Sequence, residues 1–541
     1  MVGVRRPAAG LAVLILASCT PGPARTTDGV AVVAAPTPQA AEAGIAVMLA
    51  GGNAVDAAVA VSFALGVTEP AMSGLGGQTQ ILVHPPDGPP VVINGTSYAP
   101  RATPRRAAAA DIVGHRATTV PTTVRVLDHA WRAYGSGRVA WSDLLEPAVR
   151  YAEDGFVVGS FGASVWERYA EQLGAHAATR RLFLDGDGRA PVAGAVWRQP
   201  VLARTLRRLA SDGAEEFYRG TLAREIARDM AEHRGWLTFD DLAGLPVPVE
   251  IEPLHGTYRR FDVYSLPPPG GGWVVLTMLN LLEQSPSSAL RPGTPERAAA
   301  VARALRIGHR ERRDHPVRNL VDYENDVAGK LDKATARTLL GEGDGQTTHF
   351  SVVDGDGLVV SVTQSINYAF GAKVASGRLG FLYNDYMREY ELGRPDHPFA
   401  LRAGAMPYSS MSPTIVVRDG KPVLALGSPG SARIISAVVQ VAELWMDGYA
   451  DVERAVAMPR LHVVPDSALY VEEPTDADRW RGMLASDGFV LVPRDGPAGH
   501  LDPYFGGVHA VALEGGTWTG AADPRRDGVV VRTQLATEGK Q

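Results

Sequence analysis

One segment of the sequence places a hydroxyl side chain where a nucleophile could work. A glycine- and aspartate-rich loop at residues 341–345 leads through Gln346 into Thr347, which opens a strand-like segment at residues 347–353. The loop composition indicates a mobile, exposed connection, and the segment after it is typical of a buried strand. A threonine hydroxyl at such a junction can attack a carbonyl carbon when a base takes its proton. Judged by these residues alone, however, a polar cap at the start of a strand explains Thr347 better.

Two other chemistries find little support in the sequence. The 13 histidines include no His-Glu-x-x-His motif and no pair at helical spacing within an apolar segment, so we predict no metal site. The glycine-rich run at residues 74–77 lacks the further glycine and the acidic residue of a dinucleotide fingerprint, and it follows a helical pattern instead of a strand. We interpret this run as a tight turn under closely packed backbone.

The composition is that of a globular protein with a large core. Hydrophobic residues make up 45% of the 541 residues and charged residues 21%, which excludes a disordered or collagen-like chain. The net charge is −6, and the chain has no run of five basic residues, so nucleic acid is not expected as a partner. The length suggests about two to four domains, or one large α/β unit with a second part.

The N-terminus has the pattern of a secretion signal. Arg5 and Arg6 precede an apolar run at residues 11–16 that is too short to span a bilayer. The run ends in Leu-Ala-Ser-Cys at residues 16–19, which resembles a bacterial lipobox, and Cys19 is the single cysteine of the chain. We therefore predict a lipoprotein signal peptide at residues 1–18, a lipid on Cys19 that anchors the protein to the membrane outside the cytoplasm, and a tether at residues 19–30. An ordinary signal peptide with an incidental cysteine is the alternative.

The elements that must position Thr347 follow from hydrophobic patterning. Small apolar residues predict two buried helices at residues 40–49 and 54–65, then a hairpin with strands at 80–83 and 91–93. Residues 120–235 are mostly helical in pattern and should form an outer layer, a strand is expected at 261–265 before a helix from about Trp273, and residues 296–340 are charged and helical.

Beyond residue 346 the pattern changes to strands, at residues 347–353, 358–365 and 413–418. Two of these strands are nearly continuous in apolar and small residues, which indicates burial on both faces. A sheet sandwiched between helices would bury them in this way.

Several long motifs, in this order along the chain, resemble the γ-glutamyltranspeptidase family. The resemblance runs from about residue 30 to 530, and its main motifs lie at residues 51–58, 68–77, 346–354, 409–414 and 427–430. Shorter echoes lie at residues 145–148, 155–156, 217–220, 256–258 with 267–269, and 522–525.

The resemblance implies an N-terminal-nucleophile hydrolase with a four-layer αββα sandwich of two antiparallel sheets. It also implies that the precursor cuts itself between Gln346 and Thr347, leaving a large portion at residues 31–346 and a small portion at 347–541 as a heterodimer. The chemistry is consistent, because an N-to-O acyl shift onto Thr347 followed by hydrolysis frees its α-amino group. That amine has a pKa of about 7.7–8.0 and can serve as the general base. No cofactor is needed.

Further roles are implied position by position. Ser365 and Asn367 match the hydroxyl and amide partners of the nucleophile, although the family usually has Thr at the first position. Gly430 and Ser431 match two adjacent glycines whose backbone N–H groups form the oxyanion hole. The serine at 431 is compatible with that role if its φ stays negative.

Substrate contacts match less completely. Ser409 and Ser410 match the pair that binds the donor's α-carboxylate. Thr96 stands where the family has the arginine that holds the same carboxylate, Glu389 replaces the usual Asp that takes the α-amino group, and Tyr386 replaces a neighbouring acid or amide. We therefore expect γ-glutamyl donors to bind weakly, unless an arginine of the same loop (Arg101, Arg105 or Arg106) supplies the cation.

The sequence thus predicts a lipid-anchored, self-processing amidase that cleaves a γ-glutamyl-type amide such as glutathione through an acyl-enzyme on Thr347, and passes the acyl group to water or an amine. One alternative is a cephalosporin-acylase-like amidase with a different N-acyl donor. The other is a lipoprotein that keeps the fold as a scaffold without turnover.

Overall fold

The computed structural model describes residues 29–319, 347–464, 468–473, 477–496 and 501–535. Cys19, Gln346, the expected signal peptide and nearly all of the expected tether lie outside the described residues. No helix among those described is both long and apolar enough to cross a membrane.

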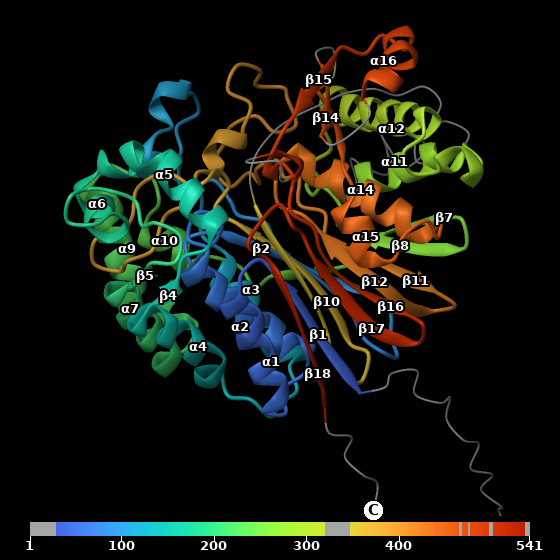
Figure 1. Ribbon diagram of the computed structural model, residues 1–541. Helices are drawn as coiled ribbons and strands as arrows, with labels where there is room; N and C mark the ends of the chain where they lie inside the picture. The colour runs from blue at the N-terminus through green and yellow to red at the C-terminus, as the bar shows by residue number, and fades with distance from the viewer. Residues whose placement is uncertain (1–28, 320–346, 465–467, 474–476, 497–500, 536–541) are drawn as a thin grey trace, which may run out of the picture.

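A seven-stranded antiparallel sheet forms one inner layer, in the order β18-β1-β9-β10-β2-β3-β6 (Figure 1). Its strands are β1 (Val30–Ala35), β2 (Gln78–His84), β3 (Val91–Gly95), β6 (Val249–Ile251), β9 (Thr348–Val353), β10 (Val359–Ser365) and β18 (Val529–Gln534). The predicted hairpin is confirmed, with Ile81 of β2 opposite Ile93 of β3. Every residue of β9 and β10 is buried, which confirms that these strands are covered on both faces.

A six-stranded antiparallel sheet forms the second inner layer, in the order β17-β16-β12-β11-β8-β7. Its strands are β7 (Leu254–Tyr258), β8 (Phe261–Ser265), β11 (Thr414–Arg418), β12 (Lys421–Gly427), β16 (His509–Glu514) and β17 (Thr517–Ala522). Apolar side chains from both sheets, among them Val32, Val353, Ile415, Val511 and Trp518, form one buried cluster between them. The two sheets therefore pack face to face.

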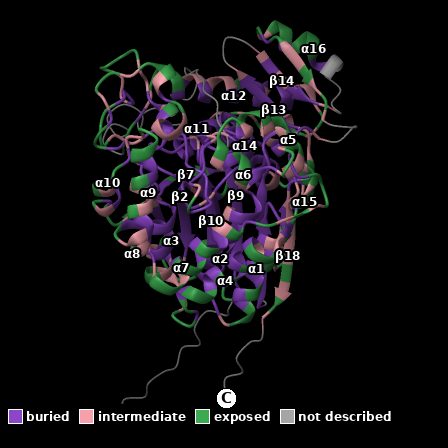
Figure 2. Cartoon of the chain, turned by 90° about the vertical axis from the view of Figure 1, so that its left-hand side faces the viewer, coloured by how far each residue is buried: buried purple, intermediate pink, exposed green. Residues whose placement is uncertain are grey.

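Helices cover the outer face of each sheet, as Figures 1 and 2 show. On the side of the seven-stranded sheet, α1 (Pro38–Leu49), α2 (Ala54–Thr68) and α3 (Thr123–Tyr134) contact the strands. The same hydrophobic cluster continues outward into α4 (Trp141–Asp154), α5 (Ser160–Gly174), α6 (Ala177–Phe183), α7 (Pro200–Asp212), α8 (Glu215–Tyr218), α9 (Thr221–Glu232) and α10 (Phe239–Ala243), with the short pair β4 (Phe156–Val157) and β5 (Val196–Trp197). On the six-stranded sheet lie α11 (Gly272–Glu283), α12 (Pro295–Asp314), α14 (Ala432–Met446), α15 (Val452–Ala457) and α16 (Ala477–Ser486), with the three-stranded sheet of β13 (Leu461–Val464), β14 (Ala468–Glu472) and β15 (Leu491–Arg494). The expected αββα sandwich is confirmed.

The start of α2 shows how the local sequence fixes where a helix begins. Asn53 precedes α2 in extended backbone, and its side-chain oxygen accepts hydrogen bonds from the N–H groups of Val55 and Asp56 at 3.0 Å. The Asp56 carboxylate accepts from the Asn53 N–H in return, also at 3.0 Å. This reciprocal cap satisfies donors that the first turn of a helix would otherwise leave unpaired.

The expected boundary at residues 346/347 does not separate two domains. The portion before it contributes β1, β2, β3 and β6 to one sheet and β7 and β8 to the other. The portion after it contributes β9, β10 and β18 to the first sheet and β11, β12, β16 and β17 to the second. Both portions therefore build one sandwich.

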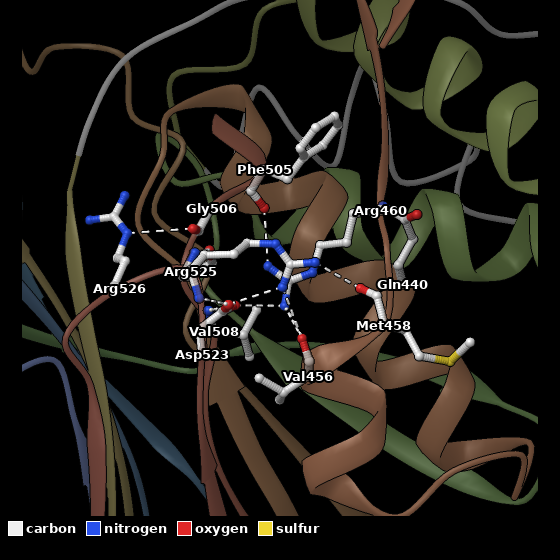
Figure 3. A network of polar contacts seen from close by, with 12 residues as sticks. Gln440, Val456, Met458, Arg460, Phe505, Gly506, Val508, Asp523, Arg525 and Arg526 are labelled. Atoms are coloured by element: carbon white, nitrogen blue, oxygen red, sulfur yellow. Dashed lines mark hydrogen bonds and ion pairs between the residues drawn. The ribbon is translucent and has the colours of Figure 1, made fainter. Parts of the chain in front are cut away.

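A buried network of charges fastens the end of β17 to the small sheet (Figure 3). The Arg525 guanidinium lies between Asp523, at 2.9 Å, and Glu472, at 2.5 Å, and Arg460 reaches the other Asp523 oxygen at 2.7 Å. Burial alone would raise the pKa of Asp523, but the two arginines hold that pKa below its usual value. Removing one partner of such a network leaves charges uncompensated in the interior.

We predict that Asp523→Asn lowers the free energy of unfolding by about 3–5 kcal/mol, because two buried guanidinium groups lose their shared carboxylate. Urea unfolding of the purified protein measures this loss. Arg303→Gln is the matched control, since it breaks the Arg303 pair with Asp487 at the surface and should cost less than about 1 kcal/mol. Equal losses for the two variants would contradict a structural role of the network.

Candidate active site

Thr347 lies immediately before β9, at one end of the seven-stranded sheet. Thr348 of β9 is paired with Gln364 of β10, so Thr347 and Ser365 are adjacent to this pair at the same end. Ser365 is in turn opposite Gln78 of β2. The side chains of Thr347 and Ser365 are both buried. The structure therefore brings together the predicted nucleophile and its predicted hydroxyl partner.

Asn367 links Ser365 to the predicted substrate residue Glu389. The Asn367 N–H donates to Ser365 Oγ at 2.7 Å, and Asn367 Nδ2 donates to Glu389 Oε1 at 3.0 Å. Asn367 has a φ of +76°, a left-handed conformation that Asn tolerates better than most residues. The predicted residues Ser365, Asn367 and Glu389 thus form one connected group beside Thr347.

Tyr386 lies on the same side, at the start of the short 3-10 turn η5 (Tyr386–Glu389). Its hydroxyl interacts with Ser365 and Gln78, and burial raises the pKa of Tyr386 well above its usual range. The phenol therefore stays protonated. The sequence assigned Tyr386 to the substrate side, and the structure places its hydroxyl against the predicted partner of the nucleophile.

Gly430 and Ser431 connect β12 to the start of α14, where backbone N–H groups point out of the helix end. Gly430 has a φ of +119°, and Ser431 has φ +69° and ψ −138°. The condition set for a serine here, a negative φ, is not met, because the turn imposes on Ser431 a conformation that suits glycine. Such a conformation costs a residue with a Cβ about 1–3 kcal/mol. The Ser431 hydroxyl is buried and has no hydrogen-bond partner within the described part of the chain.

Ser409 and Ser410 lie in the loop before β11. Ser409 Oγ accepts a hydrogen bond from the Met411 N–H at 3.2 Å, and Ser410 Oγ accepts one from Arg312 Nη2 at 2.7 Å. Arg312 belongs to α12, and the sequence analysis gave it no role. No local pattern pointed to it, because it lies in a charged segment typical of a solvated helix.

Thr96 is buried, and among the described residues its side chain contacts no cation that could replace the missing arginine. Its hydroxyl accepts from Gln80 Nε2 at 2.8 Å and donates to Asn94 Oδ1 at 2.7 Å. The loop arginines do not replace it: Arg101 lies 3.9 Å from Asp241 with 70% of its side chain exposed, and Arg105 and Arg106 are exposed as well.

Glu69 is a second residue to which the sequence analysis gave no role, and it contacts Thr348, the neighbour of Thr347 in the chain. Thr348 Oγ1 donates to Glu69 Oε2 at 2.5 Å. Burial raises the pKa of Glu69 to about 7, against the opposing effect of Arg526. Glu69 lies within one of the family-like motifs, and an acidic residue between two apolar segments was the signal that could have found it.

A pocket of 420 Å³ lies beside the start of α14. Four arginines line it (Arg168, Arg433, Arg494 and Arg526), together with Tyr504 and other residues. A second pocket of 330 Å³ includes Glu69 in its wall and shares Met72 and Phe161 with the first. Asp495 and Asp502 also line the first pocket, and Asp502 pairs with Arg494 at 2.8 Å, so arginines outnumber carboxylates there by four to two.

Three potential metal ligands come together elsewhere, although the sequence predicted no metal site. His115, Asp229 and His233 offer ligand atoms within 4.8 Å of one another. The two imidazole rings, however, stack 4.3 Å apart at an angle of 5°. Parallel rings at this spacing do not direct a nitrogen from each toward one ion, and we assign no metal to them.

Comparison with known proteins shows which family the chain resembles. The gamma-glutamyltranspeptidase family model matches residues 40–533. The glutathione hydrolase proenzyme of Escherichia coli K12 is 32% identical, with 93% of this chain and 91% of that protein covered. The acylase ACY 1 proenzyme of Pseudomonas sp. V22 is 31% identical, with 95% of each covered.

The solved structures agree. The crystal structure of cephalosporin acylase from Bacillus halodurans superposes with a TM-score of 0.83 at 26% identity, covering 98% of this chain and all of that one. The family match spans most of the sequence, and the strand that follows Thr347 is buried along its whole length. The chain belongs to the γ-glutamyltranspeptidase family of N-terminal-nucleophile hydrolases.

Proposed function

We propose that this protein is a self-processing amidase that forms an acyl-enzyme on Thr347 and cleaves a γ-glutamyl-type amide such as glutathione. The observation that carries the proposal is the position of Thr347: it precedes a strand buried on both faces, adjacent to Ser365, in a chain whose family match spans residues 40–533. The proenzyme relatives, a glutathione hydrolase and an acylase, support both self-processing and an amide substrate.

The mechanism uses groups that the fold already holds in place. After cleavage, the α-amino group of Thr347 accepts the proton of its own hydroxyl, which attacks the amide carbonyl of the donor. The hydrogen bond from the Asn367 N–H to Ser365 Oγ fixes these two residues beside Thr347. The backbone N–H groups of Gly430 and Ser431 stabilise the oxyanion, and each such donor contributes a factor of about 10²–10³. When the tetrahedral intermediate collapses, its C–N bond breaks and the donor's amine leaves with the proton held by the Thr347 α-amino group. Water or an amine then takes the acyl group from Thr347.

A second donor class is favoured by two observations. Thr96 leaves the usual position of the carboxylate-binding arginine without a cation, and the superposed structure with a TM-score of 0.83 is a cephalosporin acylase. An amidase that takes an N-acyl donor without an α-carboxylate would use the same nucleophile and oxyanion hole. The two candidates therefore differ in the acyl pocket and share the chemistry.

We further propose that the protein is a lipoprotein outside the cytoplasm, held to the membrane through Cys19. The support is the sequence alone, namely the short apolar run at residues 11–16 and the lipobox-like Leu-Ala-Ser-Cys that follows it.

Maturation tests the proposed function directly. Wild type should give two fragments on a denaturing gel, and N-terminal sequencing of the smaller one should begin at Thr347. Thr347→Ala should remain a single chain, because it lacks the hydroxyl that starts the acyl shift. An uncut wild type that still turns over substrate would exclude this mechanism, and an uncut, inert one would favour a scaffold.

The conformation of Ser431 gives a prediction for the oxyanion hole. Ser431→Gly should raise the free energy of unfolding by about 1–3 kcal/mol, because glycine adopts the same φ without strain and the lost hydroxyl had no partner among the described residues. Activity should persist, since the backbone N–H remains. Ser431→Ala is the matched control: it also removes the hydroxyl but keeps the Cβ, so any gain in its free energy of unfolding should be smaller than that of Ser431→Gly. Equal gains for the two variants would show that the hydroxyl, not the backbone, is unfavourable.

The lipid anchor is tested by fractionation. Wild type should sediment with membranes when it is made in a bacterium that processes lipoproteins. Cys19→Ser should appear as a slowly processed precursor or in the soluble fraction, because no other cysteine can carry the lipid. Metabolic labelling with a fatty acid provides the direct measurement. Unlabelled wild type in the soluble secreted fraction would refute the anchor.

A further inference from the structure

Arg312 is a buried cation that has no anionic partner among the described residues. It lies in the last turn of α12 with 3% of its surface exposed, and none of its ion pairs or hydrogen bonds in the described part of the chain involves a carboxylate. Its Nε and Nη1 atoms are buried and have no hydrogen-bond partner among the described residues. Burying a guanidinium whose N–H groups are unpaired costs free energy unless an anion pairs with it. We therefore expect a negatively charged ligand at this site.

The surroundings hold the guanidinium in one orientation. Nη2 donates to Ser410 Oγ at 2.7 Å, and the guanidinium carbon lies 4.2 Å from the centre of the Tyr408 ring. The Tyr408 hydroxyl donates to the backbone oxygen of Arg312 at 2.7 Å, so the same tyrosine contacts both the side chain and the backbone of Arg312. A planar cation stacked and bonded in this way is preorganised to receive a carboxylate.

A negative charge, that of Glu389, acts on Tyr408 in addition to the positive charge of Arg312. Burial raises the pKa of Tyr408 to about 12; Arg312 opposes that rise and the Glu389 carboxylate adds to it. Glu389 is also the acceptor for Asn367 Nδ2, so it connects this region to Ser365 and the nucleophile. A positive and a negative group beside one aromatic ring are complementary to a head group that carries both a carboxylate and an ammonium.

We propose that Arg312, together with Ser410, binds the α-carboxylate of the acyl donor and so replaces the arginine that is missing at Thr96. Glu389 then takes the ammonium of the same head group. The inference rests on the proposed amidase function and deepens it, because it selects donors with an amino-acid head group over simple N-acyl amides.

Three p-nitroanilides test this assignment. γ-Glutamyl-p-nitroanilide carries both charges, 4-aminobutyryl-p-nitroanilide lacks the carboxylate, and glutaryl-p-nitroanilide lacks the ammonium. Arg312→Gln should lower kcat/KM for the γ-glutamyl and glutaryl compounds by about tenfold to a hundredfold, mainly through KM, and change it less than about twofold for the aminobutyryl compound. Arg312→Lys should restore part of the loss, because it returns the charge without the planar geometry.

The controls separate this role from a structural one. Arg303→Gln, on the exposed side of the same helix, should leave all three substrates unchanged. Each variant is first checked for maturation into two chains, and Ser410→Ala should show the same carboxylate-dependent loss if Arg312→Gln does not mature. Equal losses on all three substrates, or none, would overturn the role of Arg312. A mature wild type that cleaves no p-nitroanilide would instead contradict the proposed function, and with it this assignment.

Discussion

The pairing of β9 with β1 on one side and β10 on the other is the constraint on which the site depends. A strand covered on both faces and bonded at both edges has one acceptable register, because a shift of one residue would turn every side chain to the opposite face. Thr347 extends directly from that strand, so its position relative to Ser365 is set by the ladder and not by a flexible loop. The nucleophile is thereby held before any substrate arrives.

Much of the scaffold could be predicted from the sequence, because its elements have strong local signals. The strand at residues 347–353 was visible from β-branched residues after a glycine-rich loop, and the helix pair of α1 and α2 from small apolar residues around Asn53. The backbone of Ser431 could not be predicted, since residue type gives only a preference for φ and the turn decides it. Arg312 was missed for a related reason: its burial depends on Tyr408 and Ser410, nearly a hundred residues later in the chain.

The buried charges of this protein fall into two kinds. Arg525 and Arg460 share Asp523 and Glu472 in a network whose charges are matched, and that network stabilises the fold. Glu69 and Arg312 lie beside the predicted nucleophile and the predicted carboxylate site, and neither has an oppositely charged hydrogen-bond partner among the described residues. Desolvation without full compensation is a common property of groups that act on a ligand.

Each sheet contains strands from both portions of the chain, and this has a consequence for the enzyme after the proposed cut between Gln346 and Thr347. Separating the portions would break the ladders between β18 and β1, β1 and β9, β10 and β2, and β11 and β8, and would open the core between the sheets. Dissociation is therefore equivalent to unfolding, and dilution should not drive it. The same arrangement dictates the order of events, because two separately made chains would each lack the neighbours that complete their sheets. Folding has to precede the cut, and the severed peptide bond makes the folded state difficult to regain once it is lost.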